Sequence, residues 1–394
     1  MRTYLLIPLL ALLASCVAAP APEHQGEWVE GAYCETGVFK LDVDFSGANM
    51  AACDILDERT IAIDLKPEDV PINASPWYAV RLTPSQPGNV KVVLRYEEHP
   101  HRYKPKISHD TQTWMVLPDH AVSVQSAGYE VSVGVALEDK PLYLAGQELI
   151  TNQVHNAWMD EHLALDHVDG RVIGQSIEAR PIRLLETNEA GDDAKVIMLV
   201  GRQHPPEITG ALAMKSFTDE VLSDSDLART FRAKFKIYMI PNLNPDGVEL
   251  GHWRHNLGGL DLNRDWGPFT QPETQAAKSV IDLIDEDKLT VFLDFHSTRR
   301  NVFYTQPVGL DGTEYGFTAQ WLARAGDKLE DYPFDRQGAH NVDLPTSKTY
   351  IFERFGVPAI TYELGDETDR TQIAETARVF AQEMMALLLE QEAS

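Results

Sequence analysis

Four residues of this 394-residue chain have the types and the spacing of a hydrolytic zinc site. His204 and Glu207 form an H-x-x-E pair, and His296 and Glu363 come much later in the chain. Many catalytic zinc ions are bound by two histidines and one glutamate, which leave the fourth position to water. A separate carboxylate can take a proton from that water. Because an isolated H-x-x-E pair is common, the surrounding sequence has to decide whether these residues act together.

Each candidate residue comes at or just after the end of a short apolar run. The runs are 195–200, 290–295 and 359–362. His296 and Glu363 directly follow the second and third runs, and His204 comes four residues after the first. Runs of this length, rich in Val, Ile, Leu and Phe and bounded by polar turns, are typical of buried strands in an α/β sheet. Ligands in such sheets gather at the carboxyl ends of the strands. The sequence therefore predicts one site built from three strands.

Further motifs stand between these positions. In chain order the set is H-P-P-E at 204–207, N-P-D-G at 244–247, W-R-H-N at 253–256, D-L-N-R at 261–264, the strand-end His296 and the late Glu363. In this combination the chain resembles the zinc metallocarboxypeptidases of the carboxypeptidase A type. It is most similar to the cytosolic carboxypeptidase branch, because H-P-P-E is close to the H-P-G-E of that branch and residues 294–303 resemble its second histidine strand. The likeness is specific from about residue 150 onward and weaker before it.

The resemblance implies a role for each residue of the set. His204, Glu207 and His296 would bind one Zn²⁺ per chain, which acidifies water and polarises a carbonyl. Glu363 would be the general base that passes the proton to the leaving amine. Arg254 would supply positive charge where the tetrahedral oxyanion develops.

Three more residues complete the implied site. Asn263 and Arg264 would hold the terminal carboxylate of a peptide, because a guanidinium matches a carboxylate with two parallel hydrogen bonds. This clamp makes the expected enzyme an exopeptidase. Asp261 would orient the first zinc histidine through its second ring nitrogen. Taken singly, these residues also have ordinary interpretations, such as a core histidine, a strand-end carboxylate in an ion pair or a surface cation, and we interpret residues 244–247 as a structural turn.

The chain departs from the family pattern at two positions. Pro206 stands where carboxypeptidase A-type enzymes have an arginine, and Asn341 where they have a mobile tyrosine, so no tyrosine is assigned and Tyr350 is expected to pack in the core. Lys348 falls at the position that the resemblance gives to the base of the pocket for the C-terminal side chain. A lysine there predicts a preference for peptides that end in Glu or Asp. A slip of one or two positions in the alignment would instead leave Lys348 on the surface.

The order of the expected elements gives the fold class. From residue 32 to 149, short strands separated by turn residues favour an antiparallel β-sandwich. They are expected at 38–43, 60–65, 77–82, 90–96, 129–135 and 141–145. From residue 150 to 394, helices at 274–285, 317–329 and 371–390 alternate with strands, which predicts an α/β catalytic domain with a mixed β-sheet flanked by helices. We interpret His99, His101 and His109 as solvated loop histidines and not as a second metal site.

The first sixteen residues have the features of an export signal. Arg2 carries a positive charge, residues 5–13 form an apolar core too short to span a bilayer as a helix, and Leu13-Ala14-Ser15-Cys16 resembles the bacterial lipobox. We expect Cys16 to be lipidated and to anchor the protein to a membrane in the bacterial periplasm, with residues 17–31 as a Pro- and Ala-rich tether. The alternative is ordinary cleavage that yields a secreted protein.

The two remaining cysteines are Cys34 and Cys53. An exported chain meets an oxidising compartment, so we expect them to form a disulfide with each other. The alternative is a pair of buried free thiols.

Composition excludes one class of partner. The chain has 34 Lys and Arg against 60 Asp and Glu, a formal net charge of −26 that repels nucleic acid and anionic membrane surfaces. Three functions remain: a zinc carboxypeptidase that acts on peptides, a zinc amidase or deacylase that acts on cell-wall peptides or N-acyl amino acids, and a non-catalytic binding lipoprotein with a relic site. Glu363 argues against the third, because relic sites often lose the proton-transfer residue.

Overall fold

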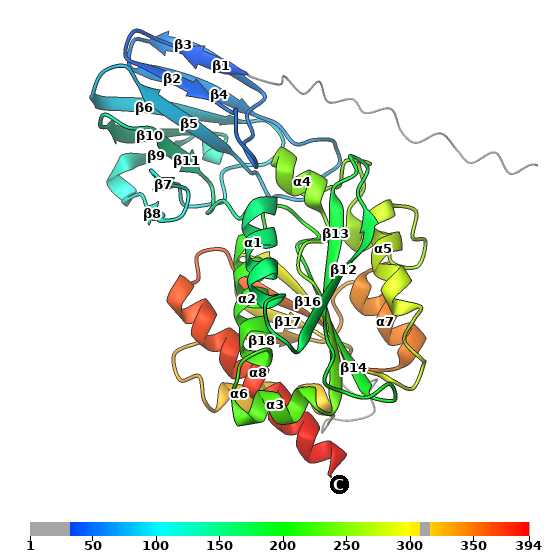
Figure 1. Ribbon diagram of the computed structural model, residues 1–394. Coiled ribbons are helices and arrows are strands. Elements are labelled where there is room, and N and C mark those ends of the chain that lie inside the picture. The colour runs from blue at the N-terminus through cyan, green and yellow to red at the C-terminus, as the bar shows by residue number, and fades with distance from the viewer. Residues whose placement is uncertain (1–31, 308–315, 394) are drawn as a thin grey trace, which may run out of the picture.

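The computed structural model describes residues 32–307 and 316–393 (Figure 1). The expected export signal, Cys16 and the tether lie outside these described residues. The described chain forms two small β-sheets from strands β1 to β11 and then a large sheet covered by helices (Figure 1). None of the helices in the described ranges is long and apolar enough to cross a membrane.

The two small sheets pack face to face. The six-stranded sheet has the order β1 (Tyr33–Glu35), β2 (Phe39–Asp42), β5 (Ala79–Pro84), β11 (Leu142–Ala145), β7 (Lys106–Ser108) and β8 (Met115–Val116). The five-stranded sheet has the order β3 (Ala52–Asp57), β4 (Thr60–Leu65), β6 (Gly88–Tyr96), β10 (Glu130–Leu137) and β9 (Val122–Gln125), beside the 3₁₀ turns η1 (Asp119–Ala121) and η2 (Ser126–Gly128). Alternate apolar residues from both sheets are fully buried in one shared core, as expected of a sandwich.

One strand pair differs from the antiparallel arrangement expected from the sequence. All other pairs in the two small sheets are antiparallel, but β4 and β6 are parallel, with Thr60 opposite Lys91 and Leu65 opposite Tyr96. The reason is the route of the chain, because β5 lies between β4 and β6 in sequence and belongs to the opposite sheet. The chain therefore leaves the five-stranded sheet after β4, crosses through β5 and returns in the original direction.

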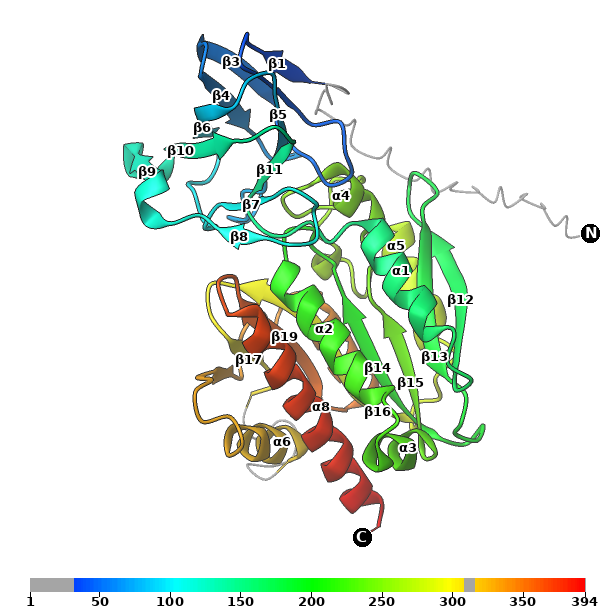
Figure 2. The same cartoon turned by 60° about the vertical axis from the view of Figure 1, so that its left-hand side comes forward.

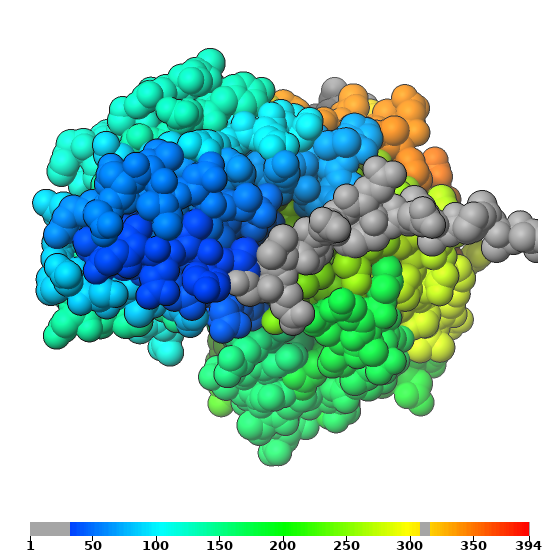
Figure 3. All heavy atoms as spheres, turned by 90° about the horizontal axis from the view of Figure 1, so that it is seen from above, coloured from blue at the N-terminus to red at the C-terminus, as the bar shows by residue number. Residues whose placement is uncertain are grey.

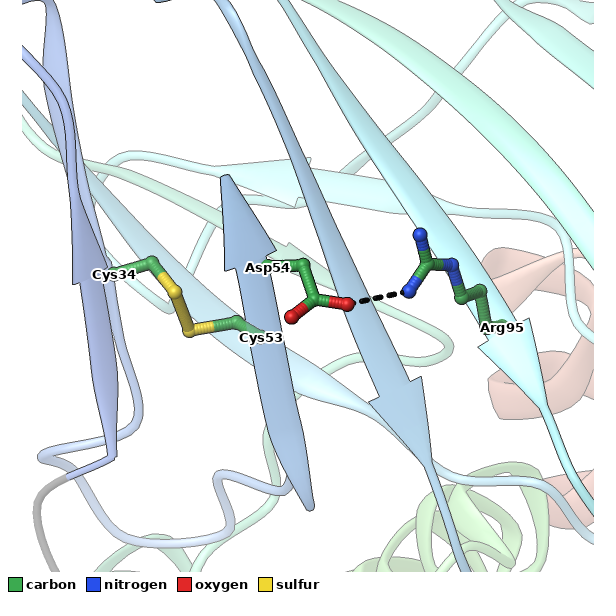
Figure 4. Close-up of a disulfide and its surroundings, with 4 residues drawn as sticks. All are labelled: Cys34, Cys53, Asp54 and Arg95. Atoms are coloured by element: carbon green, nitrogen blue, oxygen red, sulfur yellow. Dashed lines mark hydrogen bonds and ion pairs between the residues drawn. A yellow bond between two sulfur atoms is a disulfide. The ribbon is translucent and has the colours of Figure 1, made fainter. Parts of the chain in front are cut away.

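Cys34 and Cys53 form a disulfide, with their Cα atoms 6.1 Å apart (Figure 4). Cys34 lies on β1 and Cys53 on β3, so the bond joins the edge strands of the two sheets. The structure thus contains the pairing that the sequence predicted. Next to it, Asp54 accepts a hydrogen bond of 2.7 Å from Arg95 on β6 (Figure 4).

The large sheet has eight strands in mixed directions. Their order is β12 (Val168–Gln175), β13 (Pro181–Thr187), β15 (Phe235–Ile240), β14 (Lys195–Gly201), β16 (Leu289–Thr298), β19 (Ala359–Gly365), β17 (Val302–Tyr304) and β18 (Asp335–Gln337). The three strands predicted to carry the site, β14, β16 and β19, are adjacent and parallel at the centre. Their buried residues read as almost continuous apolar runs, which is typical of a sheet covered on both faces.

Helices cover both faces of this sheet (Figures 1 and 2). On one face lie α1 (Asn152–His162), α2 (Ile208–Val221), α3 (Asp226–Arg232), α6 (Phe317–Gly326) and α8 (Arg370–Glu392). On the other face lie α5 (Pro272–Ile281) and α7 (Ser347–Phe355). The short helix α4 (Pro245–Leu250) and the 3₁₀ turn η3 (Leu262–Arg264) belong to the connections at the carboxyl ends of the strands. The mixed, helix-flanked sheet predicted from the sequence is therefore confirmed.

The small sheets rest directly on the helix-covered part, as the space-filling view shows (Figure 3). Trp253, which follows α4, is fully buried in the core cluster of the small sheets. Gly251 has φ 63°, and a Cβ there would lie 2.8 Å from the carbonyl oxygens of Gly47 and Ala48. Only glycine fits this close approach without strain, so the connection after α4 is held tightly against the first part of the chain.

Candidate active site

The predicted site residues lie together around a cavity of about 590 Å³. The strand ends of β16 and β19, the start of α2, the connection after α4 and the start of α7 all contribute to it. Eight of the residues singled out from the sequence line the cavity: His204, Glu207, Arg254, Asn263, Arg264, His296, Lys348 and Glu363.

The expected metal ligands converge at the bottom of the site. Ligand atoms of His204, Glu207 and His296 all lie within 4.8 Å of one another, and all three side chains are buried. The Nδ1 atoms of the two histidines are 3.2 Å apart, and the Glu207 oxygens lie 2.9 and 2.6 Å from them. Two ligands bound to tetrahedral zinc at ~2.0–2.1 Å are about 3.3 Å apart. The donor types suit a zinc ion, and the three groups are close enough to share one after the donors move apart by a few tenths of an ångström.

A close contact between α2 and β16 makes this convergence possible. Glu207 directly precedes α2, and a Cβ on Gly210 in the first turn would lie 2.5 Å from the carbonyl oxygen of His296. Gly210 N also donates to Ser297 Oγ at 2.8 Å. The absence of a side chain at position 210 lets the helix start against the strand, and this contact brings Glu207 to His296.

Carboxylates hold the outer ring nitrogens of both histidines. His204 Nε2 lies 2.8 Å from Asp261 Oδ1, as the resemblance implied, and His296 Nε2 lies 2.9 Å from Asp294 Oδ2. Such partners fix the tautomer, so that Nδ1 is left to bind a metal. The sequence reasoning missed Asp294, although its position two residues before His296 on a strand puts both side chains on one face.

Asp261 also holds Arg254. Its Oδ2 atom accepts a hydrogen bond of 2.8 Å from Arg254 Nε, and Arg254 Nη1 lies 3.9 Å from Glu207 Oε1. Although burial raises the pKa of Asp261, the neighbouring His204 and Arg254 lower that pKa well below its usual range. The carboxylate therefore stays ionised and ties the first histidine to the arginine.

Glu363 lies beside the second histidine on the central sheet. In the register of β16 and β19, His296 is opposite Glu363, so both side chains are on the same face. The Oε2 atom of Glu363 is buried and has no hydrogen-bond partner within the described part of the chain. Burial, followed by the negative charge of Glu207, raises the pKa of Glu363. This carboxyl group is available to accept and donate a proton.

The two residues expected to clamp a terminal carboxylate are placed differently. Asn263 is buried, its Oδ1 accepts from Ser347 N at 2.8 Å, and its Nδ2 lies 3.3 Å from His296 Nε2. The Arg264 side chain is 28% exposed, and its Nη1 donates to the Asn263 carbonyl oxygen at 2.7 Å. Both residues line the cavity, with Arg264 the more accessible to a ligand.

Lys348 lies in the first turn of α7 and not on the surface. Its side chain lines the cavity and the residue is 3% exposed. Burial lowers the pKa of Lys348. Among residues 32–307 and 316–393, no carboxylate is within ion-pair distance of its ammonium group. A buried ammonium group without a counter-charge is costly.

Several cavity residues were not found from the sequence. His99, which the sequence analysis interpreted as a solvated loop histidine, and Arg102 come from the connections of the small sheets, and Arg299, Tyr304 and His340 come from the catalytic part. Arg102 is held by Asp366 through hydrogen bonds of 2.8 and 3.0 Å, so it joins the two parts of the molecule. Arg299 stands in the segment 294–303 that resembles the second histidine strand, but that likeness gave it no role; the other residues have no local pattern, because their neighbours in space come from distant segments of the chain.

Tyr350 and the three loop histidines are all partly buried. Tyr350 is expected in the core; it is partly buried and packs against Trp266 and Phe269 at the edge of the core. The three histidines interpreted as solvated are only partly exposed: His99, His101 and His109 hydrogen-bond to Ile72 O, the Tyr96 hydroxyl and Pro141 O. They do not form a metal cluster, because within the described ranges His204, Glu207 and His296 make up the one such group.

A family model described as zinc carboxypeptidase matches residues 156–383, which is more than half of the 394-residue chain. The chain therefore belongs to the zinc carboxypeptidase family, and the resemblance noted in the sequence is confirmed.

Named relatives place it more closely. It is 34% identical over 152 residues to cytosolic carboxypeptidase 6 of Mus musculus, covering 35% of this chain and 28% of that protein. It is 37% identical over 137 residues to cytosolic carboxypeptidase 2 of Xenopus tropicalis, covering 33% of this chain and 14% of that protein. The chain thus matches less than a third of the length of either relative.

Solved structures share the whole architecture. A metallo-carboxypeptidase from Burkholderia cenocepacia superposes with a TM-score of 0.75 and 19% identity, covering 91% of this chain and 100% of that chain. A metallo-carboxypeptidase from Pseudomonas aeruginosa, in complex with (2-guanidinoethylmercapto)succinic acid, gives 0.72 and 20%, covering 89% and 99%. At 19% and 20% sequence identity the likeness establishes the fold alone. The two superpositions cover 91% and 89% of this chain and therefore include the small sheets.

Proposed function

We propose that this protein is a zinc-dependent carboxypeptidase that hydrolyses the C-terminal peptide bond of peptides. The observation that carries the proposal is the convergence in one cavity of three metal-ligand side chains, a separate carboxylate and two arginines. Membership of the zinc carboxypeptidase family supports it.

His204, Glu207 and His296 are proposed to hold one zinc ion per chain. The ion supplies a Lewis acid that activates water and polarises the scissile carbonyl. The number follows from the single cluster of suitable donors in the described residues. Asp261 and Asp294 keep the two imidazole rings oriented for this task.

Glu363 is proposed to move the proton. Its carboxylate takes a proton from the attacking water and then donates it to the nitrogen of the leaving amine, so that the C–N bond can break. The position of Glu363 opposite His296 supports this role, because base and metal ligands then face the same point. Among the residues that the structure describes, its Oε2 atom has no hydrogen bond that would have to break first.

Arg254 is proposed to stabilise the oxyanion of the tetrahedral intermediate. Asp261 engages its Nε atom, which leaves the terminal N–H groups to donate to a developing negative charge. Such interactions strengthen as the charge forms and therefore lower the barrier.

Asn263 and Arg264 are proposed to bind the terminal carboxylate of the peptide. Arg264 is the more exposed of the two and has the planar fork that a carboxylate matches. This contact would restrict cleavage to the last peptide bond.

We also propose that acidic C-terminal residues are preferred. Five cationic side chains line the cavity, against two carboxylates, in a protein whose net charge is −26. The cations are Arg102, Arg254, Arg264, Arg299 and Lys348. Arg102 is already paired with Asp366, whereas Lys348 has no carboxylate partner among the described residues. Lys348 is therefore the residue assigned to the acidic side chain.

Export and membrane anchoring through a lipidated Cys16 are part of the proposal. The lipobox-like sequence before Cys16 supports anchoring. The disulfide between Cys34 and Cys53 supports an oxidising compartment, because such bonds are rare where thiols are kept reduced.

The activity is tested with pairs of peptides that differ only at the C-terminus. A peptide with a free carboxylate should lose its last residue, and the same peptide with a C-terminal amide should be cleaved at least about 10²-fold more slowly, because the arginine clamp has no partner. A zinc chelator should abolish cleavage, and added Zn²⁺ should restore it. Release of an acyl group from N-acyl amino acids, without peptide cleavage, would instead establish the deacylase. Binding of peptides without any product would identify a relic site.

A further inference from the structure

The connection that carries Arg254 is held by a side chain from the other part of the molecule. Glu68 lies between β4 and β5 of the small sheets, far from residue 254 in sequence. One of its carboxylate oxygens accepts hydrogen bonds from the backbone N–H groups of Arg254 at 2.8 Å and His255 at 2.5 Å, and the other accepts from Trp253 at 2.7 Å. Three successive N–H groups therefore point to one carboxylate.

This geometry is that of an anion-binding concavity in the backbone. Successive N–H groups that face the same side attract a negative charge, and here a protein carboxylate occupies the position. Asp69, the next residue, binds the His255 imidazole, so the same loop contacts the connection twice. Trp253, on the other side of Arg254, is fully buried in the core of the small sheets.

Arg254 is thus fixed at both ends. Asp261 holds Nε of its side chain at 2.8 Å, and Glu68 holds its backbone. Displacement of the backbone by even a fraction of the length of a hydrogen bond would move the guanidinium relative to the metal ligands. A misplaced catalytic group can lower turnover strongly even when substrate binding is unchanged.

We propose that Glu68 is a positioning residue for catalysis, which holds Arg254 where the oxyanion forms and makes the small-sheet part a component of the active site. This inference rests on the proposed role of Arg254. Glu68 does not touch the cavity itself and acts through the backbone of residues 253–255.

The test uses the variants Glu68→Gln, Arg254→Ala and the double variant of the full chain, with kcat and KM measured on a peptide that ends in glutamate. Glu68→Gln removes the charge and turns an N–H donor toward one of the three backbone donors. We expect kcat to fall by about 10-fold or more with KM within about 2-fold, the pattern of a lost transition-state interaction. In the Arg254→Ala background, Glu68→Gln should change kcat by less than about 2-fold, because neighbouring residues that act together are not additive.

Glu148→Gln is the matched control. Glu148 is also a carboxylate of the first part of the chain that bonds to the second, but it binds Arg370 at the start of α8. Its kcat and KM should stay near the native values. Equal losses of kcat from Glu68→Gln with and without Arg254 would show a general structural role and overturn the proposal. A native kcat in Glu68→Gln would also overturn it.

Two further measurements test whether Glu68 positions Arg254. If Glu68→Gln does not fold, Glu68→Asp retains the charge and shortens the side chain, and an unchanged kcat in that variant would overturn the proposal. If the native protein cleaves no peptide, the proposed function fails separately. Hydrogen exchange then decides the positioning contact: the amides of residues 253–255 should exchange faster in Glu68→Gln than in Glu148→Gln, and equal exchange would refute it.

Discussion

Asp294 Oδ2 lies 2.9 Å from His296 Nε2, two residues further along the central strand β16. Because side chains alternate along a strand, the two residues project from the same face. The aspartate also accepts a hydrogen bond of 2.6 Å from Gln203 and is completely buried. A partner held in this way keeps the imidazole with its Nδ1 atom toward the other two ligands.

The first prediction is that Asp294→Asn weakens zinc binding. The amide cannot provide the negative charge that orients the histidine and raises its basicity, so the dissociation constant for Zn²⁺ should rise by about 10- to 100-fold. Competition with a fluorescent chelator measures it directly. Asp193→Asn, at an exposed aspartate near Lys288, is the control and should bind zinc like the native protein. Equal affinities in all three proteins would show that Asp294 has no such role.

The second prediction concerns Glu363→Gln. The amide has the same shape but cannot take a proton, so kcat should fall at least about 10²-fold. The zinc content should stay near one ion per chain, because Glu363 is not among the three ligands. Elemental analysis and steady-state kinetics on the same sample test both parts. Near-native turnover in a zinc-loaded sample would exclude Glu363 as the base.

The third prediction assigns specificity to Lys348. Replacing it with methionine keeps the apolar stem and removes the charge. The ratio of kcat/KM for peptides ending in Glu to those ending in Leu should fall by about 10-fold or more, the scale of a charge-assisted hydrogen bond. Arg299→Met, at another cation that lines the cavity, tests whether the effect depends on position. A native protein that does not distinguish Glu from Leu would refute the assignment before any variant is made.

The fourth prediction concerns stability and pH at Glu273 in α5. The side chain is fully buried, Oε2 accepts from Asn256 Nδ2 at 2.9 Å, and Oε1 has no partner within the described residues. Burial raises the pKa of Glu273 to about 7. The protonated form is therefore favoured in the folded protein, and the stability that it contributes is full below the ordinary glutamate pKa and is lost as pH rises through about 7.

Glu273→Gln removes this titration and keeps an acceptor for Asn256. Between pH 5 and pH 8, the free energy of unfolding of the native protein should fall relative to the variant by about 2–3 kcal/mol, since one pKa unit corresponds to about 1.4 kcal/mol. Urea denaturation of both proteins at the two pH values measures the difference. Parallel pH dependences in the two proteins would mean that Glu273 does not titrate in this range.

The fifth prediction concerns the N-terminus. Expression in a bacterial host with its own lipoprotein pathway should yield a chain that begins at an acylated Cys16, and Cys16→Ser should release the protein from the membrane fraction. Intact-mass spectrometry distinguishes the two forms. A native chain with an unmodified Cys16 would contradict the lipid anchor.

Much of the catalytic part could be read from the sequence because its signals are local. His204 and Glu207 are three positions apart in the sequence. The apolar runs before them and before His296 have the length of buried strands. Parallel strands of one sheet bring their carboxyl ends to one edge, so the convergence of these residues with Glu363 followed from the pattern alone. Asp294 belonged to the same local pattern and could have been found from its position on the strand.

The amino-acid sequence by itself determined the central strands β14, β16 and β19, the helices α5, α6 and α8, the ligand types and the family. The tertiary structure alone decided which distant groups support them. Glu68 reaches the backbone of Arg254 from another sheet, β4 pairs with β6 in parallel because the chain crosses between them, and Lys348 is buried in the cavity instead of exposed. These contacts depend on how the two parts of the molecule pack against each other. The packing is driven by burial of apolar surface, which is non-directional, and so no local sequence pattern reveals which distant residues come into contact.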